Sequence, residues 1–159
     1  MKIRIIAIGK IKETYLKLGI DEYVKRIKPY SQIEIVEVND EPVRDNPNDS
    51  EINLVKNKEG QKVLKLLKDS DYVINLDLGK KQLKSPEFAR FLEEKLVLGN
   101  SQVTFVIGGS YGLSDELKMR ANDSISLSEM TFLHQMTRLI LVEQIYRAFK
   151  INRNETYHK

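Results

Sequence analysis

Strand-like and helix-like segments alternate along the whole of this 159-residue chain, and that alternation is what most restricts its fold. Short apolar stretches, typical of buried strands, cover residues 3–8, 33–38, 72–78, 102–107 and 124–128. Segments with helical spacing of apolar residues cover 12–28, 51–68, 85–98, 114–121 and 133–150. This order predicts one α/β domain, a parallel sheet with helices on both faces.

Local signals place the boundaries of these elements. We expect the helix at 51–68 to be capped by Asp49 or Ser50 and weakened in its middle by Gly60. The strand at 72–78 should end at Gly79. The next helix should begin with the hydroxyl of Ser85 as its N-cap, followed by a proline in its first turn. Residues 39–50, rich in acids and containing two prolines, predict a loop.

Composition excludes several kinds of chemistry. The chain has no cysteine, which rules out disulfides, cysteine-ligated metals and a cysteine nucleophile. No apolar run approaches the roughly 18 residues that a membrane span needs, and the apolar N-terminal stretch ends too early for a signal peptide. We expect a cytoplasmic protein. The net charge is only +3, but residues 1–28 hold eight Lys or Arg against three acids. Such a basic segment could bind a polyanion, or it could be an ordinary solvated surface.

A glycine-rich turn follows the strand at 102–107. In parallel sheets ligands bind at the carboxyl ends of strands, where glycines let a ligand approach the backbone. The turn Gly108-Gly109-Ser110-Tyr111-Gly112 lacks the glycine spacing of a dinucleotide site and the Gly-Lys of an ATP loop. It predicts a site for another small ligand, or a plain turn between a strand and a helix.

The last expected helix changes character along its length. Its second half is cleanly amphipathic, but its first half is polar on the side that later becomes apolar, and apolar on the opposite side. The misplaced apolar residues could meet a partner subunit, and the polar ones could line a site or form a satisfied core cluster. The apolar residues are Met136, Leu139 and Ile140; the polar residues are His134, Gln135 and Arg138.

The chain ends in Tyr157-His158-Lys159. An isolated terminal histidine is usually a solvated surface residue, but beside tyrosine and lysine it could act as an acid–base group. His158 and His134 are the only histidines, and no carboxylate stands at a matching spacing, so we expect no metal site.

Taken together, these segments resemble the SPOUT-superfamily methyltransferases that modify N3 of a pseudouridine in large-subunit ribosomal RNA. The resemblance covers essentially the whole chain, and its combined pattern is highly specific. It is carried by Gly9-Lys10, Phe105-Val106-Ile107-Gly108-Gly109-Ser110, Gly112-Leu113, Leu127-Ser128-Glu129-Met130-Thr131-Phe132, His134-Gln135-Met136, Arg138, Glu143-Gln144, Tyr146-Arg147-Ala148 and Tyr157-His158-Lys159.

The resemblance implies a C-terminal trefoil knot, a homodimer with the active site near the subunit interface, and S-adenosylmethionine as the cofactor. In the catalytic step, it implies His158 as a candidate base, Tyr157 as a group that orients the base or stacks on the nucleobase, and Arg138 as a contact to RNA or cofactor. It places the cofactor at Leu76, Gly108, Leu127, Ser128, Glu129, Met130, Thr131 and Phe132. The expected phosphate contacts, at the basic ends of the chain, are Lys10, Lys12, Arg153 and Lys159.

The chain departs from the family pattern at two places. Leu133 stands where the family usually has proline, and Asn154 and Thr156 stand where its tail carries glycine and often proline. The turn of the tail could therefore differ. Two rival functions stay open: a non-catalytic RNA-binding or ribosome-binding module of the same fold, and a nucleotide-dependent hydrolase. The hydrolase is disfavoured because no nucleophile elbow is present.

Overall fold

The computed structural model of the chain describes residues 1–99 and 102–159. These residues form five strands that pair in parallel in the order β2-β1-β4-β3-β5. The parallel sheet confirms the predicted fold class, whereas the trefoil knot stays a prediction. The strands are β1 (Lys2–Ile8), β2 (Gln32–Val38), β3 (Tyr72–Gln82), β4 (Gln102–Ile107) and β5 (Asp123–Ser126).

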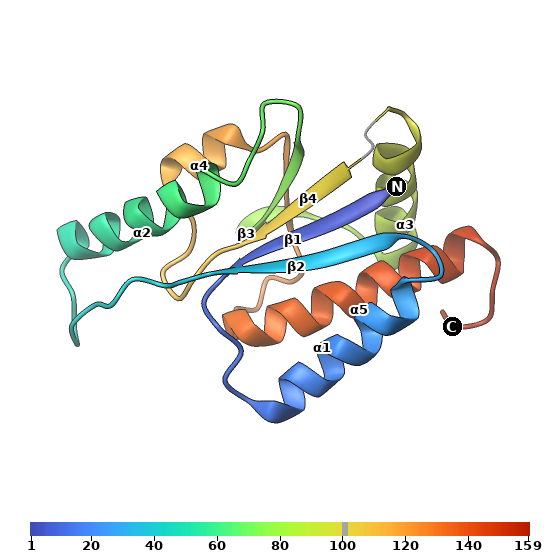
Figure 1. The fold of residues 1–159 in the computed structure, drawn as a ribbon, viewed down its shortest axis with the longest axis horizontal. Coiled ribbons are helices and arrows are strands. Elements are labelled where there is room, and N and C mark those ends of the chain that lie inside the picture. The colour runs from blue at the N-terminus through green and yellow to red at the C-terminus, as the bar shows by residue number, and fades with distance from the viewer. Residues whose placement is uncertain (100–101) are drawn as a thin grey trace.

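Helices cover both faces of the sheet (Figure 1). One face carries α1 (Thr14–Ile27), α3 (Ser85–Val97) and α5 (His134–Asn152), and α5 packs between the other two. The opposite face carries α2 (Asp49–Leu64) and the short α4 (Asp115–Arg120). Within the described part of the chain, no helix is long and apolar enough to cross a membrane.

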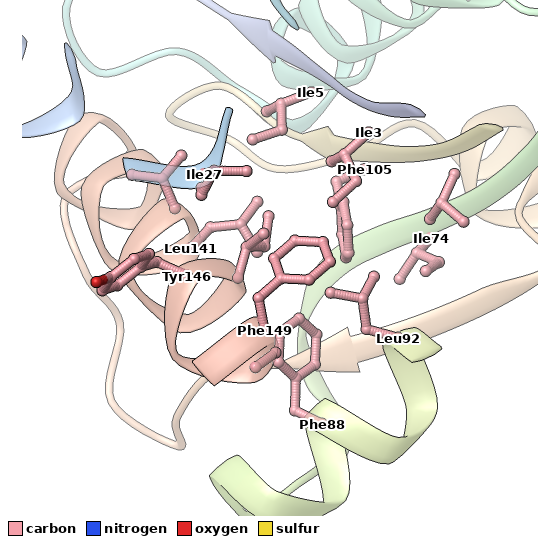
Figure 2. Packing of buried hydrophobic residues seen from close by; sticks show 14 of the residues in the cluster. Ile3, Ile5, Ile27, Ile74, Phe88, Leu92, Phe105, Leu141, Tyr146 and Phe149 are labelled. Carbon is pink, nitrogen blue, oxygen red and sulfur yellow. The ribbon is translucent and has the colours of Figure 1, made fainter. Parts of the chain in front are cut away.

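The core has one cluster on each face of the sheet. Alternate residues of the central strand β1 point to opposite faces: Ile3 and Ile5 join the larger cluster, Ile6 and Ile8 the smaller. This is why β1 reads as a continuous apolar run rather than an alternating one. Figure 2 shows the larger cluster, where Phe88, Leu92, Phe105, Leu141 and Phe149 fill the space between the sheet, α3 and α5.

Three local predictions were wrong. The cap of α2 is Asn48, whose side chain accepts a hydrogen bond from the Glu51 amide at 2.8 Å, rather than Asp49 or Ser50. Ser85 does not cap α3, because its hydroxyl donates to Gln144 of α5 at 2.8 Å.

The end of β3 also differs from the prediction. The strand does not stop at Gly79 but continues to Gln82, because pairing with β5 resumes at Lys81 after an irregular register that follows Leu76. Residues 77–80 therefore lie in the interruption of this ladder, beside the carboxyl ends of the strands.

Gly60, expected only to weaken α2, is needed for the contact between α2 and α4. A Cβ at this position would overlap Ser114 Oγ and lie 3.1 Å from Ser114 Cβ. Ser114 is 2% exposed and caps α4, since its hydroxyl accepts a hydrogen bond from the Leu117 amide at 3.2 Å. The two helices thus meet where the chain has no side chain to interfere.

We expect Gly60→Ala to destabilise the protein by about 1–3 kcal/mol, although alanine gains roughly 0.5–1 kcal/mol in helix preference. The cause is overpacking against Ser114, which has no room to move. Denaturant unfolding measures the effect, with Lys58→Ala on the exposed side of α2 as control, for which the change should stay within about 0.5 kcal/mol. A Gly60→Ala protein as stable as the wild type would contradict this account of the helix contact.

Candidate active site

A cavity of about 500 Å³ lies at the carboxyl ends of the sheet strands. Its lining comes from residues 76–78 of β3, the end of β4, the glycine turn after β4, the loop between β5 and α5, the start of α5, and single residues of α2 and α4. This volume falls in the usual range for small-molecule and cofactor sites. The cavity also occupies the place where parallel sheets bind ligands.

The glycine turn forms one wall of the cavity. The Gly112 amide donates to the Gly109 carbonyl at 3.1 Å, and Gly112 has a φ of +88°, a left-handed value that favours glycine. A Cβ on Gly108 would lie 3.0 Å from the Gly112 carbonyl carbon and 3.1 Å from a methyl of Leu113. The turn is therefore folded so tightly on itself that backbone atoms, rather than side chains, face the ligand at this point.

The other walls differ in polarity. The loop between β5 and α5 contributes apolar side chains, among them Leu127, Met130 and Phe132. The α2 and α4 side contributes two cations, Lys56 and Lys118, and Lys118 Nζ lies 4.0 Å from the carboxylate of Asp77, which lines the cavity from within β3. An amphipathic ligand with one flat apolar part and one charged part would match this division.

The structure brings together the predicted cofactor residues, with one exception. Glu129 is exposed and does not line the cavity. The residues that do line it are Leu76, Gly108, Leu127, Ser128, Met130, Thr131 and Phe132. The Ser128 hydroxyl accepts a hydrogen bond from the Met130 amide at 3.0 Å, which shapes the loop that holds most of them.

Arg138 lies outside this cavity, buried to 2% exposure beneath the loop that follows β1. Its guanidinium donates to Glu37 Oε2 at 2.7 Å and to the Gly9 carbonyl at 3.1 Å. Burial opposes the charge of Glu37, but hydrogen bonds from Arg138 and from the Ile11 amide hold the pKa of that carboxyl below its ordinary value. Within one subunit, Arg138 therefore holds the loop in place and does not reach the cofactor cavity.

The other two members of the polar trio also hold this loop. Gln135 Oε1 accepts a hydrogen bond from the Lys12 amide at 3.0 Å. His134 lines the cavity and packs on Gly9, where a Cβ would lie 3.5 Å from His134 Nε2. Burial, with the charges of Arg138 and Lys12, lowers the pKa of His134, so this imidazole is neutral at pH 7. The trio thus positions a loop at the edge of the cavity, although Arg138 Nε is buried with no hydrogen-bond partner among the described residues.

Removing the Glu37 carboxylate and removing the Arg138 guanidinium should have unequal effects on stability, although the two groups form one ion pair. Glu37→Leu leaves a buried cation without its carboxylate and should destabilise the protein by about 3 kcal/mol. Arg138→Met leaves a half-exposed carboxylate and one carbonyl, and should cost about 1 kcal/mol. The carboxylate of Glu37 stabilises the fold above its unfolded pKa of about 4.3. Urea unfolding should therefore show the Glu37→Leu deficit at pH 7 and a smaller one at pH 3; equal deficits for the two variants would contradict this.

The apolar residues at the start of α5 do not all face outward. Leu139 is partly buried within its own subunit, 3.0 Å from where a Cβ of Gly19 would be, and its contact with a partner stays a prediction. Met136 and Ile140 are half-buried. The strongly exposed apolar side chains nearby are instead Tyr15 and Leu18 of α1, and Met130 and Leu133 just before α5.

The C-terminal tail folds back along the second half of α5. The Tyr157 hydroxyl donates to Glu143 at 3.0 Å and lies 3.3 Å from the Tyr23 hydroxyl, while its ring packs edge-on against Tyr146. Burial and these two hydroxyl contacts raise the pKa of Tyr157, so the phenol stays protonated.

His158 is exposed, and its Nδ1 lies 3.1 Å from Arg147 Nη1. Since a guanidinium only donates, Nδ1 accepts, and the neutral ring carries its proton on Nε2. A base must present an unprotonated nitrogen. Proton removal by His158 therefore requires Nδ1 to leave Arg147 when substrate binds.

The tail and the cavity lie at opposite ends of the subunit. The cavity reaches the first turns of α5, through His134 and Thr137, whereas the tail contacts the end of α1 and the start of β2 through Tyr23 and Tyr30. His158 contacts Arg147, which lies ten residues beyond Thr137 in α5 and therefore about 15 Å further along the helix. In Figure 1 the C-terminus lies at the end of the sheet where β1 begins. One subunit alone does not bring His158 to the cavity.

The predicted RNA contacts form two groups. Lys10 and Lys12 are exposed on the loop beside the cavity. Arg153 and Lys159 are exposed at the tail, and the Arg153 guanidinium lies 4.8 Å from the centre of the Tyr30 ring. One group of predicted RNA contacts therefore lies beside the cavity, and the other lies with His158 at the tail.

The departures from the family pattern are compatible with the observed backbone. Leu133 has a φ of −53°, close to the value that proline would impose. Asn154 has a φ of +54°, a left-handed value that asparagine tolerates better than most residues other than glycine. The tail therefore makes its turn without the glycine.

Sequence reasoning missed the charged wall of the cavity. Asp77 directly follows the predicted contact Leu76 at the strand end, so its place could have been inferred. Lys56 lies in α2 and Lys118 in α4, on the face of the sheet opposite α5. No local pattern separates these two lysines from ordinary surface lysines. Among the described residues, no group of three His, Cys, Asp or Glu is placed to hold a metal ion.

Comparison with known proteins extends over the whole chain. A family profile described as "Predicted SPOUT methyltransferase" matches residues 1–158. Proteins named "Ribosomal RNA large subunit methyltransferase H" from Clostridioides difficile and Carboxydothermus hydrogenoformans are each 52% identical over 159 residues, all of both chains. A probable methylase family protein from Haemophilus influenzae has a similar fold, with a TM-score of 0.54 at 15% identity over 99% of this chain and 70% of that one. The chain therefore belongs to the SPOUT methyltransferase family.

Proposed function

We propose that this protein transfers a methyl group from S-adenosylmethionine to N3 of a pseudouridine in large-subunit ribosomal RNA. The observation that carries the proposal is the cavity at the carboxyl ends of the strands, in a chain of this family. The names of its full-length relatives support large-subunit ribosomal RNA as the substrate. Such a substrate is met in the cytoplasm.

The residues of the cavity fit this cofactor. The apolar side chains of the loop between β5 and α5 suit an adenine ring, and the glycine turn offers backbone close to a ligand. The cofactor supplies a sulfonium methyl that is already a strong electrophile. The protein then needs no nucleophile of its own; it must hold the attacking nitrogen in line, and such positioning can supply about 7–11 kcal/mol.

The active site we propose is shared by two subunits. Because about 15 Å of α5 lies between Thr137, at the edge of the cavity, and Arg147, which His158 contacts, His158 would serve the cavity of the partner. Exposed apolar side chains beside the cavity, at Met130 and Leu133, and on α1, at Tyr15 and Leu18, are available for the contact between subunits.

In this arrangement the tail supplies the catalytic groups. His158 accepts the N3 proton, directly or through water, after its Nδ1 leaves Arg147. Tyr157, a protonated phenol packed on Tyr146, orients the histidine or stacks on the base. Arg138 acts as a positioning residue that keeps Lys10 and Lys12 beside the cavity. With the two subunits joined, both predicted groups of RNA contacts would border one site.

The experiment that tests this function uses labelled S-adenosylmethionine with whole ribosomes, free large subunits and naked ribosomal RNA. We expect label in large-subunit RNA, at N3 of one pseudouridine when the modified base is mapped. Cofactor binding without transfer to any of the three substrates would overturn the substrate assignment. No cofactor binding at all would favour the non-catalytic RNA-binding module.

A further inference from the structure

The carboxylate of Asp77 is not accounted for by the fold. It lines the cavity directly after Leu76, at the point where the ladder between β3 and β5 is interrupted. Its side chain is only 14% exposed, and its Oδ2 is sealed from solvent with no hydrogen-bond partner among the described residues. A buried carboxylate oxygen without a donor is costly, which suggests that a donor arrives with the ligand.

The surrounding charges narrow the choice of donor. Lys118 Nζ lies 4.0 Å from Asp77 Oδ2, too far for a hydrogen bond, and its side chain is 41% exposed. Lys56 lines the same cavity from α2. Two cations and one carboxylate on this side of the cavity form a pattern that complements a zwitterion, with one negative and one positive end.

Among the parts of S-adenosylmethionine, only the amino-acid end is such a zwitterion. Adenine matches the apolar wall of Leu127, Met130 and Phe132. Ribose hydroxyls could donate to a carboxylate, but they would leave the two lysines without an anion. A contact to the sulfonium alone would leave them unpaired in the same way.

We propose that Asp77 binds the α-ammonium of the cofactor's methionine end, while Lys118 and Lys56 bind its carboxylate. The proposal rests on the proposed function, because it assigns a subsite within the same cavity. Asp77 would then fix the direction in which the cofactor lies, with the adenine toward the loop between β5 and α5 and the amino acid toward α2 and α4.

Calorimetric binding of three ligands tests the assignment: S-adenosylmethionine; S-adenosylhomocysteine, which lacks the sulfonium charge; and methylthioadenosine, which lacks the amino-acid end. We expect Asp77→Asn to weaken the first two ligands by at least about tenfold, and to change methylthioadenosine by less than about twofold. Asp69→Asn, an exposed carboxylate outside the cavity, is the matched control and should leave all three affinities unchanged.

The other outcomes separate the alternatives. An equal loss for all three ligands would place Asp77 on the adenosine, and a loss for S-adenosylmethionine alone would place it on the sulfonium; either result overturns the proposal. If Asp77→Asn does not fold, Lys118→Met tests the same subsite. It should weaken the binding of S-adenosylmethionine and S-adenosylhomocysteine, but not that of methylthioadenosine. If the wild-type protein binds none of the ligands, the proposed function itself fails, which is distinct from a variant that does not discriminate among them.

Discussion

His158→Ala should lower single-turnover methyl transfer by about 10²–10⁴-fold, the range that a positioned acid–base group supplies. Cofactor binding should not change, because the side chain lies beside Arg147 and does not line the cavity of its own subunit. The variant should also keep its stability, since His158 is exposed and its hydrogen bond to Arg147 is the one given by the described residues. Rapid-quench kinetics on ribosomal substrate, with calorimetry of the cofactor, would measure both quantities.

Thr156→Ala is the control within the tail, since this residue is exposed and should keep wild-type transfer. The structure also raises a second candidate for the base. His134 lines the cavity, and its lowered pKa keeps it neutral at pH 7. If transfer survives His158→Ala but fails in His134→Asn with the cofactor still bound, the proton is removed from inside the cavity and the tail has another role.

Gly108→Val should reduce the affinity for S-adenosylmethionine by at least about 100-fold, which corresponds to roughly 3 kcal/mol of overpacking. A first side-chain carbon at this position would already meet the Gly112 carbonyl carbon at 3.0 Å and Leu113 at 3.1 Å. The two further methyl groups of valine must either open the turn or enter the cavity. Both outcomes remove the close approach of backbone to ligand.

A graded series provides the control for this prediction. Gly108→Ala adds one carbon and should lose less affinity than Gly108→Val, while circular dichroism and thermal melting report whether each variant keeps its fold. If Gly108→Val binds the cofactor as tightly as the wild type, the glycine turn is not part of the cofactor site.

The fold was largely predictable because its signals are local. The apolar run of β1, for example, is buried on both faces of the sheet, so its pattern alone indicates a central parallel strand. The carboxyl ends of β3 and β4, and hence the cavity at Leu76 and Gly108, follow from the same reading. The continuation of β3 to Gln82 could not be predicted, because pairing with β5 decides it after an interruption.

The parts of the site that were not predictable depend on contacts between distant segments. Arg138 was assigned to substrate or cofactor, yet its partners Glu37 and Gly9 lie more than a hundred residues earlier in the chain. The place of His158 depends on the length of α5 and on the turn at Asn154, not on any motif. Local patterns therefore located residues that line the cavity, but not which of the predicted catalytic residues lie together in one subunit.

The sharing of one active site by two subunits is tested most directly by mixing two inactive variants. Gly108→Val has a defective cavity and an intact tail, and His158→Ala has the reverse. Co-expressed and purified through separate tags, their mixed dimers contain one site with both parts intact. We expect about half of wild-type activity from the purified mixed dimers, because one of their two sites is intact, and about a quarter from an unpurified statistical mixture. If His158 instead serves the cavity of its own chain, every site in the mixture is defective, and activity would stay at the level of the single variants.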